Sequence, residues 1–103
     1  MYIEVEKQKL LRHLEILSRI SAKQQTLPVL QCVLVDAGDQ LKGLILRATN
    51  LELGIEVRID GLITEGGVLA APAGLLTETI RLLYDKMIIL KTEGEMLVVE
   101  SGK

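Results

Sequence analysis

The hydrophobic pattern of this chain changes its period from two residues to about 3.6 residues and back, and it does so twice. Tyr2–Val5 alternates apolar and charged side chains, which predicts a strand, whereas Lys7–Ile20 has helical spacing. The same change recurs between the short apolar run Val68–Ala71 and the segment Leu75–Leu83. Helices in such a chain must bury their apolar faces against the strands, so the pattern favours an α+β fold.

The first helical segment predicts an amphipathic helix with a basic back. Its apolar positions share one face; they are Leu10, Leu11, Leu14, Leu17 and Ile20. Basic side chains gather on roughly the opposite face; they are Lys9, Arg12, Arg19 and Lys23. The polar segment Ser21–Leu27 followed by Pro28 predicts a loop after this helix.

Alternation and turn residues predict five further strands. They are Gln31–Val35, Leu41–Ala48, Leu51–Ile59, and a hairpin of Met87–Thr92 with Met96–Glu100. The strand Leu51–Ile59 alternates apolar and polar residues along most of its length, which is typical of a strand with one wet face. The glycine-containing segment Asp60–Gly67 predicts a loop.

The second helix is expected to begin at Pro72, a residue that suits a first helical turn. Its predicted buried positions are Leu75, Leu76, Ile80, Leu82 and Leu83. Its predicted outer positions are Thr77, Glu78, Arg81 and Tyr84. The order strand-helix-strand-strand-strand thus occurs once in full and a second time without its last strand. We expect one domain over residues 1–103, a fragment of a longer chain, with one shared antiparallel sheet and both helices on one face of it.

Composition and charge exclude several classes of protein. With 49% hydrophobic and 25% charged residues the chain is globular rather than disordered. No apolar stretch approaches the ~20 residues of a bilayer span, so we expect a cytoplasmic protein without a membrane partner. The net charge is −2, yet five basic residues and one acid lie between Lys7 and Lys23. The positive charge is therefore local to the first helix.

No catalytic or metal-binding constellation is visible in the sequence. The glycines match neither the P-loop nor the dinucleotide-binding spacing. His13 is the single histidine and has no serine or cysteine placed for it to activate, and Cys32 is expected to be a small core residue. We therefore expect a protein that is not an enzyme, without metal or cofactor.

Four short motifs in order resemble one known family. They are Thr26-Leu27-Pro28-Val29-Leu30, Ala48-Thr49-Asn50-Leu51-Glu52-Leu53-Gly54-Ile55, Pro72-Ala73 and Ser101-Gly102-Lys103. In this order and at this spacing, over nearly the whole chain, they resemble the first domain of the bacterial replicative sliding clamps, the beta subunits of DNA polymerase III.

The resemblance implies a DNA-clamp fold and a non-catalytic role in DNA replication. In that family each chain has three such domains, and two chains close into a homodimeric ring around duplex DNA, with the helices lining the hole. The ring tethers DNA polymerase III and slides with it. The polymerase subunits and the clamp loader bind to domains outside this chain. A sliding ring needs sequence-independent attraction to phosphates, which a basic helix face supplies.

The resemblance also implies roles for individual residues. The expected DNA-facing cations are Lys9, Arg12, Arg19, Lys23 and Arg81. Two further DNA-facing positions depart from the family, because Gln24 and Gly74 stand where many members have basic residues. The expected ring-interface residues are Leu75, Thr79, Leu82 and Lys103.

Two other interpretations of the residues stay open. The first is a stand-alone interaction module that dimerises through a sheet edge and never meets nucleic acid. The second, a small hydrolase that uses surface carboxylates such as Glu52 and Glu56, has less support, because these side chains lie on the wet side of a predicted strand, where solvation is the ordinary explanation.

Overall fold

The structure is a computed structural model that describes residues 1–20, 31–50 and 52–101. Within them the helices are α1 (Lys7–Ile20) and α2 (Ala73–Arg81). The strands are β1 (Tyr2–Glu6), β2 (Cys32–Asp36), β3 (Leu44–Thr49), β4 (Gly54–Ile59), β5 (Gly61–Glu65), β6 (Val68–Pro72), β7 (Met87–Glu93) and β8 (Met96–Ser101).

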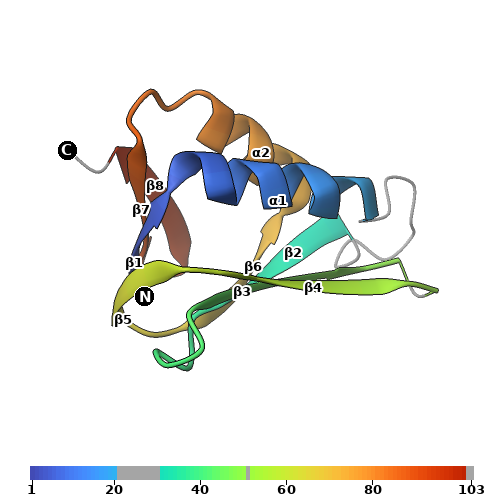
Figure 1. The fold of residues 1–103 in the computed structure, drawn as a ribbon, viewed down its shortest axis with the longest axis horizontal. Coiled ribbons are helices and arrows are strands. Elements are labelled where there is room, and N and C mark those ends of the chain that lie inside the picture. Colours follow the sequence, from blue (N-terminus) through green and yellow to red (C-terminus); the bar gives the residue numbers. More distant parts are fainter. Residues whose placement is uncertain (21–30, 51, 102–103) are drawn as a thin grey trace.

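The strands form two antiparallel sheets of four strands, ordered β5-β1-β7-β8 and β4-β3-β2-β6. The α+β class is confirmed, but the single shared sheet expected from the sequence is wrong. Each helix connects a strand of one sheet to a strand of the other: α1 connects β1 to β2, and α2 connects β6 to β7. Strands β1 and β7 pair in one sheet, and β2 and β6 pair in the other. Strand order depends on contacts between distant segments, which the local pattern does not contain. Helices α1 and α2 lie side by side over the β4-β3-β2-β6 sheet (Figure 1).

The two halves of the chain use the same arrangement. In the first half β1 lies in one sheet, α1 follows, and β2 and β3 form a hairpin in the other sheet. In the second half β6 lies in the sheet that holds β2 and β3, α2 follows, and β7 and β8 form a hairpin beside β1. The repeat predicted from the element order is therefore present in space, and the two helices occupy corresponding positions.

Strand β5 lies where the sequence predicts a loop. It pairs with β1, with Ile63 opposite Ile3 and Leu62 opposite Glu4. Ile63 is the one buried residue of this edge strand, so β5 has no alternation of buried and exposed apolar residues. A strand with a single buried position gives no periodic signal in the sequence, which explains the error.

The core lies between the helices and the inner faces of the sheets. Its largest fully buried side chains are Ile3, Val5, Leu10, Leu14, Leu17, Val33, Val35, Leu44, Leu46, Ile80, Ile88 and Leu90. The predicted stripe of α1 is confirmed at Leu10, Leu14 and Leu17. Neither helix is long and apolar enough to cross a membrane, a statement that holds for the described residues.

The predicted buried face of α2 is wrong at three positions. Leu75 and Leu82 are 66% and 76% exposed, whereas Thr77 is 3% exposed. The Thr77 hydroxyl donates a hydrogen bond of 2.7 Å to the carbonyl of Ala73, which satisfies the donor and permits burial. The prediction counted leucines rather than faces: the nine-residue helix buries one narrow face, so Leu75 remains outside, as does Leu82 at the C-cap.

Cys32 is half-buried rather than a core residue. It alternates along β2 with Val33 and Val35, which are fully buried, so its side chain belongs to the outer face of the sheet together with Leu34. An apolar run cannot reveal which of its members faces the core, because every position in it is hydrophobic.

Candidate nucleic-acid interface

Helix α1 turns a basic surface away from the core. Lys9, Arg12 and Arg19 are exposed, while Leu10, Leu14 and Leu17 are fully buried on the other side of the same helix. Leucines spaced by three and four residues fix the rotation of the helix about its axis, and that rotation places the basic positions outward. In the described part of the chain, no ion pair joins these three side chains to a carboxylate.

The exposed surface of α2 consists of two strips. Gly74, Glu78 and Arg81, spaced by four and three residues, form a polar strip, and Arg81 places this strip beside α1. Leu75, Thr79 and Leu82 form an apolar strip with the same spacing. Thr79 is half-buried, and its hydroxyl donates a hydrogen bond of 2.8 Å to the carbonyl of Leu75. The three α2 residues expected at a ring interface therefore share one strip of this helix.

Arg81 bridges the two helices. Its Nη2 donates to Oε2 of Glu15 on α1 at 2.8 Å, and its Nη1 donates to Oε1 of Glu78 on α2. The hydrogen bond with Glu15 and then that with Glu78 raise the pKa of Arg81 above its ordinary value. Arg81 thus lies in the layer formed by α1 and α2, which we call the helix layer, and its guanidinium is bound by two carboxylates.

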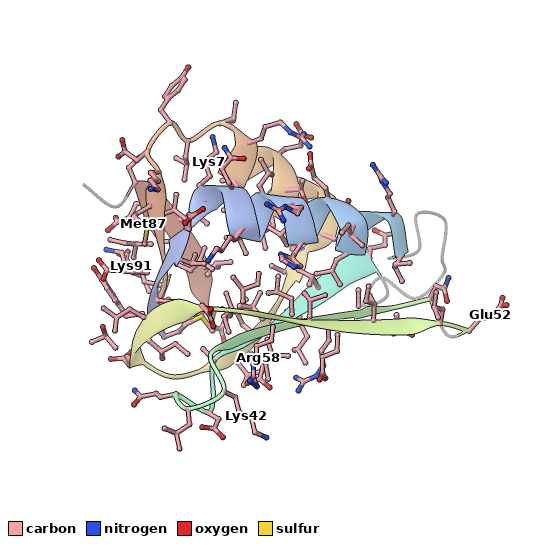
Figure 2. All side chains as sticks on the ribbon, viewed as in Figure 1. Lys7, Lys42, Glu52, Arg58, Met87 and Lys91 are labelled. Atoms are coloured by element: carbon pink, nitrogen blue, oxygen red, sulfur yellow. The ribbon has the colours of Figure 1, made fainter. Side chains whose placement is uncertain are left out.

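Lys7 is also engaged at the helix pair. Its Nζ donates to the carbonyl of Leu83, just beyond α2, and its backbone N–H donates to the carbonyl of Lys86 at 2.8 Å. Figure 2 shows Lys7 in the helix layer, and Lys42 and Arg58 on the opposite side of the sheet that contains β3 and β4. We call the β4-β3-β2-β6 sheet the sheet layer. Its outward cations lie on the side of the molecule opposite to those of the helix layer (Figure 2).

The structure brings together several of the predicted DNA-facing residues. Lys9, Arg12, Arg19, Gly74 and Arg81 all lie in the helix layer. A Cβ added at Gly74 would meet no atom within 4 Å beyond its own helix backbone and chain neighbours, so the position has room for a side chain. Lys23, Gln24 and Lys103 lie outside the described residues, as does the Thr26–Leu30 motif.

Sequence reasoning missed the contacts of Glu15 and Glu78. Glu15 stands three residues after Arg12 and four before Arg19, and Glu78 stands three before Arg81. These spacings place each acid beside a cation on its own helix, a signal that is visible in the sequence. The pairing of Glu15 with Arg81, 66 residues away, required the packing of α1 on α2.

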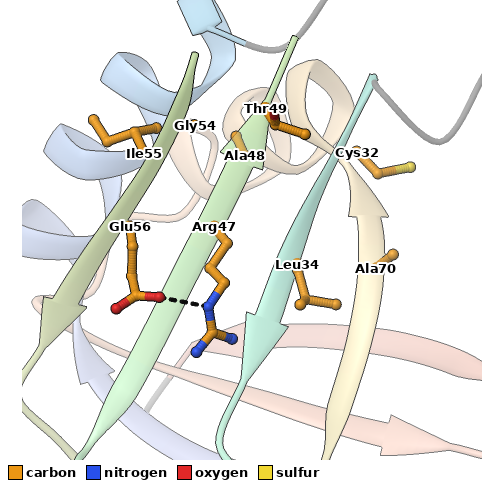
Figure 3. A pocket seen from close by; sticks show the side chains of 9 residues that line it. All are labelled: Cys32, Leu34, Arg47, Ala48, Thr49, Gly54, Ile55, Glu56 and Ala70. Atoms are coloured by element: carbon orange, nitrogen blue, oxygen red, sulfur yellow. Dashed lines mark hydrogen bonds and ion pairs between the residues drawn. The ribbon is translucent and has the colours of Figure 1, made fainter. Parts of the chain in front are cut away.

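Hollows in the described part of the chain lie away from the basic surface. A groove of about 350 Å³ runs between α2 and the strands β6 and β8, and Leu75 and Thr79 lie on its helical wall. A second hollow of about 560 Å³ lies on the outer face of the β4-β3-β2-β6 sheet (Figure 3). Cys32, Leu34 and Ala70 form the apolar side of the second hollow, next to the ion pair of Arg47 with Glu56.

Comparison with known proteins identifies the family. The model of the "DNA polymerase III beta subunit, N-terminal domain" matches residues 1–103. The chain is 32% identical to the beta sliding clamp of Pseudomonas aeruginosa and 31% identical to that of Pseudomonas putida, over its whole length in both cases. It spans 28% of the length of each of these curated relatives.

Solved structures agree with this similarity. A candidate DNA polymerase III beta subunit from Eubacterium rectale aligns over 100% of this chain and 28% of its own, with a TM-score of 0.91 and 33% identity. The pol III beta of Caulobacter crescentus aligns over the same shares with a TM-score of 0.89 and 28% identity. The family predicted from the four motifs is thereby confirmed: the chain belongs to the N-terminal domains of the DNA polymerase III beta subunits.

Proposed function

We propose that this chain is a domain of a sliding clamp, a processivity factor that encircles duplex DNA and tethers a replicative polymerase. The observation that supports this proposal most strongly is the surface of α1, where Lys9, Arg12 and Arg19 are exposed and unpaired with any described carboxylate. Family membership supports the same function, because the curated relatives are named beta sliding clamps.

The chemistry of this surface suits sliding rather than reading of sequence. Lysine and arginine side chains attract phosphates, which repeat along the duplex regardless of sequence. Beside this surface, α2 turns outward the polar strip of Gly74, Glu78 and Arg81. Such contacts can be exchanged from one phosphate to the next, so a ring lined by them stays on DNA while it moves along it.

The larger assembly is part of the proposal. We infer that the chain is the first of three similar domains and that two three-domain chains close into a ring. Leu75, Thr79 and Leu82, together with Lys103, would contact the neighbouring chain. The polymerase subunits and the clamp loader would bind to the other domains. The protein would act in the cytoplasm on chromosomal DNA and would perform no reaction of its own.

A titration with duplex DNA tests the proposed function. The chain is titrated against two fluorescent duplexes of unrelated sequence at several salt concentrations, and binding is followed by anisotropy. We expect weak binding, equal for the two sequences, that fades as salt rises because each phosphate contact releases counterions. Tight binding that salt does not weaken, or a preference for one sequence, would contradict a sliding surface.

A self-associating module without a DNA role is the second candidate. The exposed leucines of the apolar strip, Leu75 and Leu82, favour it. Analytical ultracentrifugation of the wild-type chain and of Leu75→Ser/Leu82→Ser, run beside the titration, separates the two candidates. Self-association that the double variant abolishes, with no DNA binding at any salt concentration, would favour the module over the clamp.

A further inference from the structure

The acidic side chains of the helix layer are all bound to one arginine. Helices α1 and α2 contain two acidic residues between them, Glu15 and Glu78. Both carboxylates accept hydrogen bonds from the guanidinium of Arg81. The other exposed cations of α1, Lys9, Arg12 and Arg19, form no ion pair with a described residue. Both negative charges of the two helices are therefore paired with the same cation, Arg81.

The position of Glu15 places this cluster inside the basic surface. Glu15 lies three residues after Arg12 and four residues before Arg19, so its side chain emerges between those two arginines on α1. Its carboxylate nevertheless binds Arg81 of α2, at 2.8 Å. A duplex that contacts Arg12 and Arg19 would therefore pass over the Glu15–Arg81 pair.

The ion pairs are exposed enough to be exchanged. The side chains of Arg81, Glu15 and Glu78 are 44%, 43% and 66% exposed. Exposed ion pairs contribute little to stability, and salt screens them. A guanidinium also binds phosphate through two parallel hydrogen bonds, as it binds carboxylate. Carboxylate and phosphate thus compete for the same donor groups of Arg81.

We propose that Glu15 and Glu78 act as internal competitors of DNA phosphate for Arg81, so that they weaken the hold of this domain on duplex DNA. The inference rests on the proposed function, because it assumes that the helix layer faces DNA. It assigns the two glutamates a positioning role: they keep one arginine of the basic surface out of phosphate contact. A weaker hold suits a ring that must move along its track.

Four chains in a double-mutant cycle test the competition: wild type, Glu15→Gln/Glu78→Gln, Arg81→Gln, and the triple variant. We expect Glu15→Gln/Glu78→Gln to bind a short duplex about five- to tenfold more tightly at low salt, with the slope of log K against log salt steeper by about one phosphate contact. Arg81→Gln should change the affinity of wild type by less than about twofold, yet remove most of the gain in the double-Gln background.

Other results of the cycle would overturn the inference. An equal cost of Arg81→Gln in both backgrounds would mean that the charges simply add and that the carboxylates do not occupy Arg81. A larger cost in wild type would mean that Arg81 shields DNA from the two acids. Unchanged affinity of Glu15→Gln/Glu78→Gln would exclude competition directly.

Two further variants separate the inference from the proposed function. Arg12→Gln/Arg19→Gln should weaken binding strongly, and if it does not, the helix layer does not face DNA and the proposed function fails. Glu52→Gln also removes a carboxylate charge, half the charge change of Glu15→Gln/Glu78→Gln, but lies in the sheet layer, at the turn before β4 (Figure 2). It should leave the affinity unchanged. Thermal unfolding of every variant confirms that the fold is retained.

Discussion

The cation Arg47 on the outer face of the β4-β3-β2-β6 sheet and the exposed cations of α1 differ in their ion pairs. On the outer face of the sheet, Arg47 donates to Asp36 at 2.7 Å and to Glu56 at 2.6 Å. In the other sheet, Nζ of Lys91 on β7 lies 3.5 Å from Oε2 of Glu93 and 3.4 Å from Oε2 of Glu100. On α1, by contrast, Arg12 and Arg19 form no ion pair with a described residue. In the described residues, Arg47 is therefore paired with two carboxylates, whereas the exposed cations of α1 form no ion pair.

The difference follows from where the acids are placed. Cross-strand neighbours are directly opposite one another in an antiparallel sheet, so a residue such as Arg47 on β3 meets Glu56 on β4 by register. On a helix, only residues three or four positions apart are neighbours, and α1 contains a single acid. The exposed cations of α1 are therefore unpaired in the described residues because this helix has few acids, although the net charge of the whole chain is −2.

Charge reversal on α1 should produce the largest change in affinity for duplex DNA. We expect Arg12→Glu/Arg19→Glu to weaken binding to duplex DNA by about thirtyfold or more at low salt, because two attractive charges become repulsive. Stability should change little, since both positions are exposed. The matched control is Arg58→Glu on the sheet layer, measured in the same anisotropy titration. Equal losses for the two variants would erase the distinction between the layers.

Addition of a cation to α2 should raise the affinity for duplex DNA, by a smaller factor than charge reversal on α1 lowers it. Gly74→Arg places a guanidinium on the polar strip, where a Cβ has room, and we expect about threefold to fivefold tighter binding at low salt. Replacement of a helical glycine gains about 0.5–1 kcal/mol, and a cation in the first turn offsets part of that gain. Gly74→Ala is the control: it should stabilise the fold somewhat more than Gly74→Arg does, without a change in affinity.

We expect the smallest effect from the ion pair of Arg47 with Asp36 in the sheet layer, as a pH dependence of the free energy of unfolding. The guanidinium of Arg47, and then the backbone N–H of Gly38, hold the pKa of Asp36 below its ordinary value. A depressed folded-state pKa stabilises the fold above the unfolded-state pKa of about 4, and this contribution is lost as the pH falls through the folded-state value.

Substitution of Asp36 measures that contribution. Asp36→Asn should lower the free energy of unfolding by no more than about 1 kcal/mol at neutral pH, because the ion pair is partly exposed. The difference from wild type should shrink as the pH is lowered toward about 3. Urea denaturation at several pH values measures it. A difference that stays constant over this range would show that the hydrogen bonds of Asp36, and not its charge, stabilise the sheet.

Much of the fold could be predicted from local patterns. The bounds of α1 and its buried leucines agree with the prediction, as do the hairpin of β7 and β8 and the alternation along β4. Strand β5 could not be predicted, because a strand with one buried residue has no periodicity. The orientation of Leu75 and Leu82 could not be predicted either, since hydrophobicity alone does not say which leucines of a short helix find partners.

The candidate site was predictable as a surface but not in its contacts. The outward position of Lys9, Arg12 and Arg19 follows from the leucines on the other side of α1, so the sequence was sufficient. The state of Arg81 was not predictable in the same way, because one of its two partners, Glu15, belongs to a helix more than sixty residues away. Pairing of that kind is a property of helix packing.

The amino-acid sequence by itself determined the element types, the repeat and the basic side of α1, because periods of 2 and 3.6 residues are set by the geometry of each element alone. The tertiary structure alone decided that the strands divide into two sheets and that Arg81 is held by Glu15. The physical reason is the same for both: hydrogen bonds between strands and ion pairs between helices form only when segments distant in the chain are brought within a few ångströms by burial of the core.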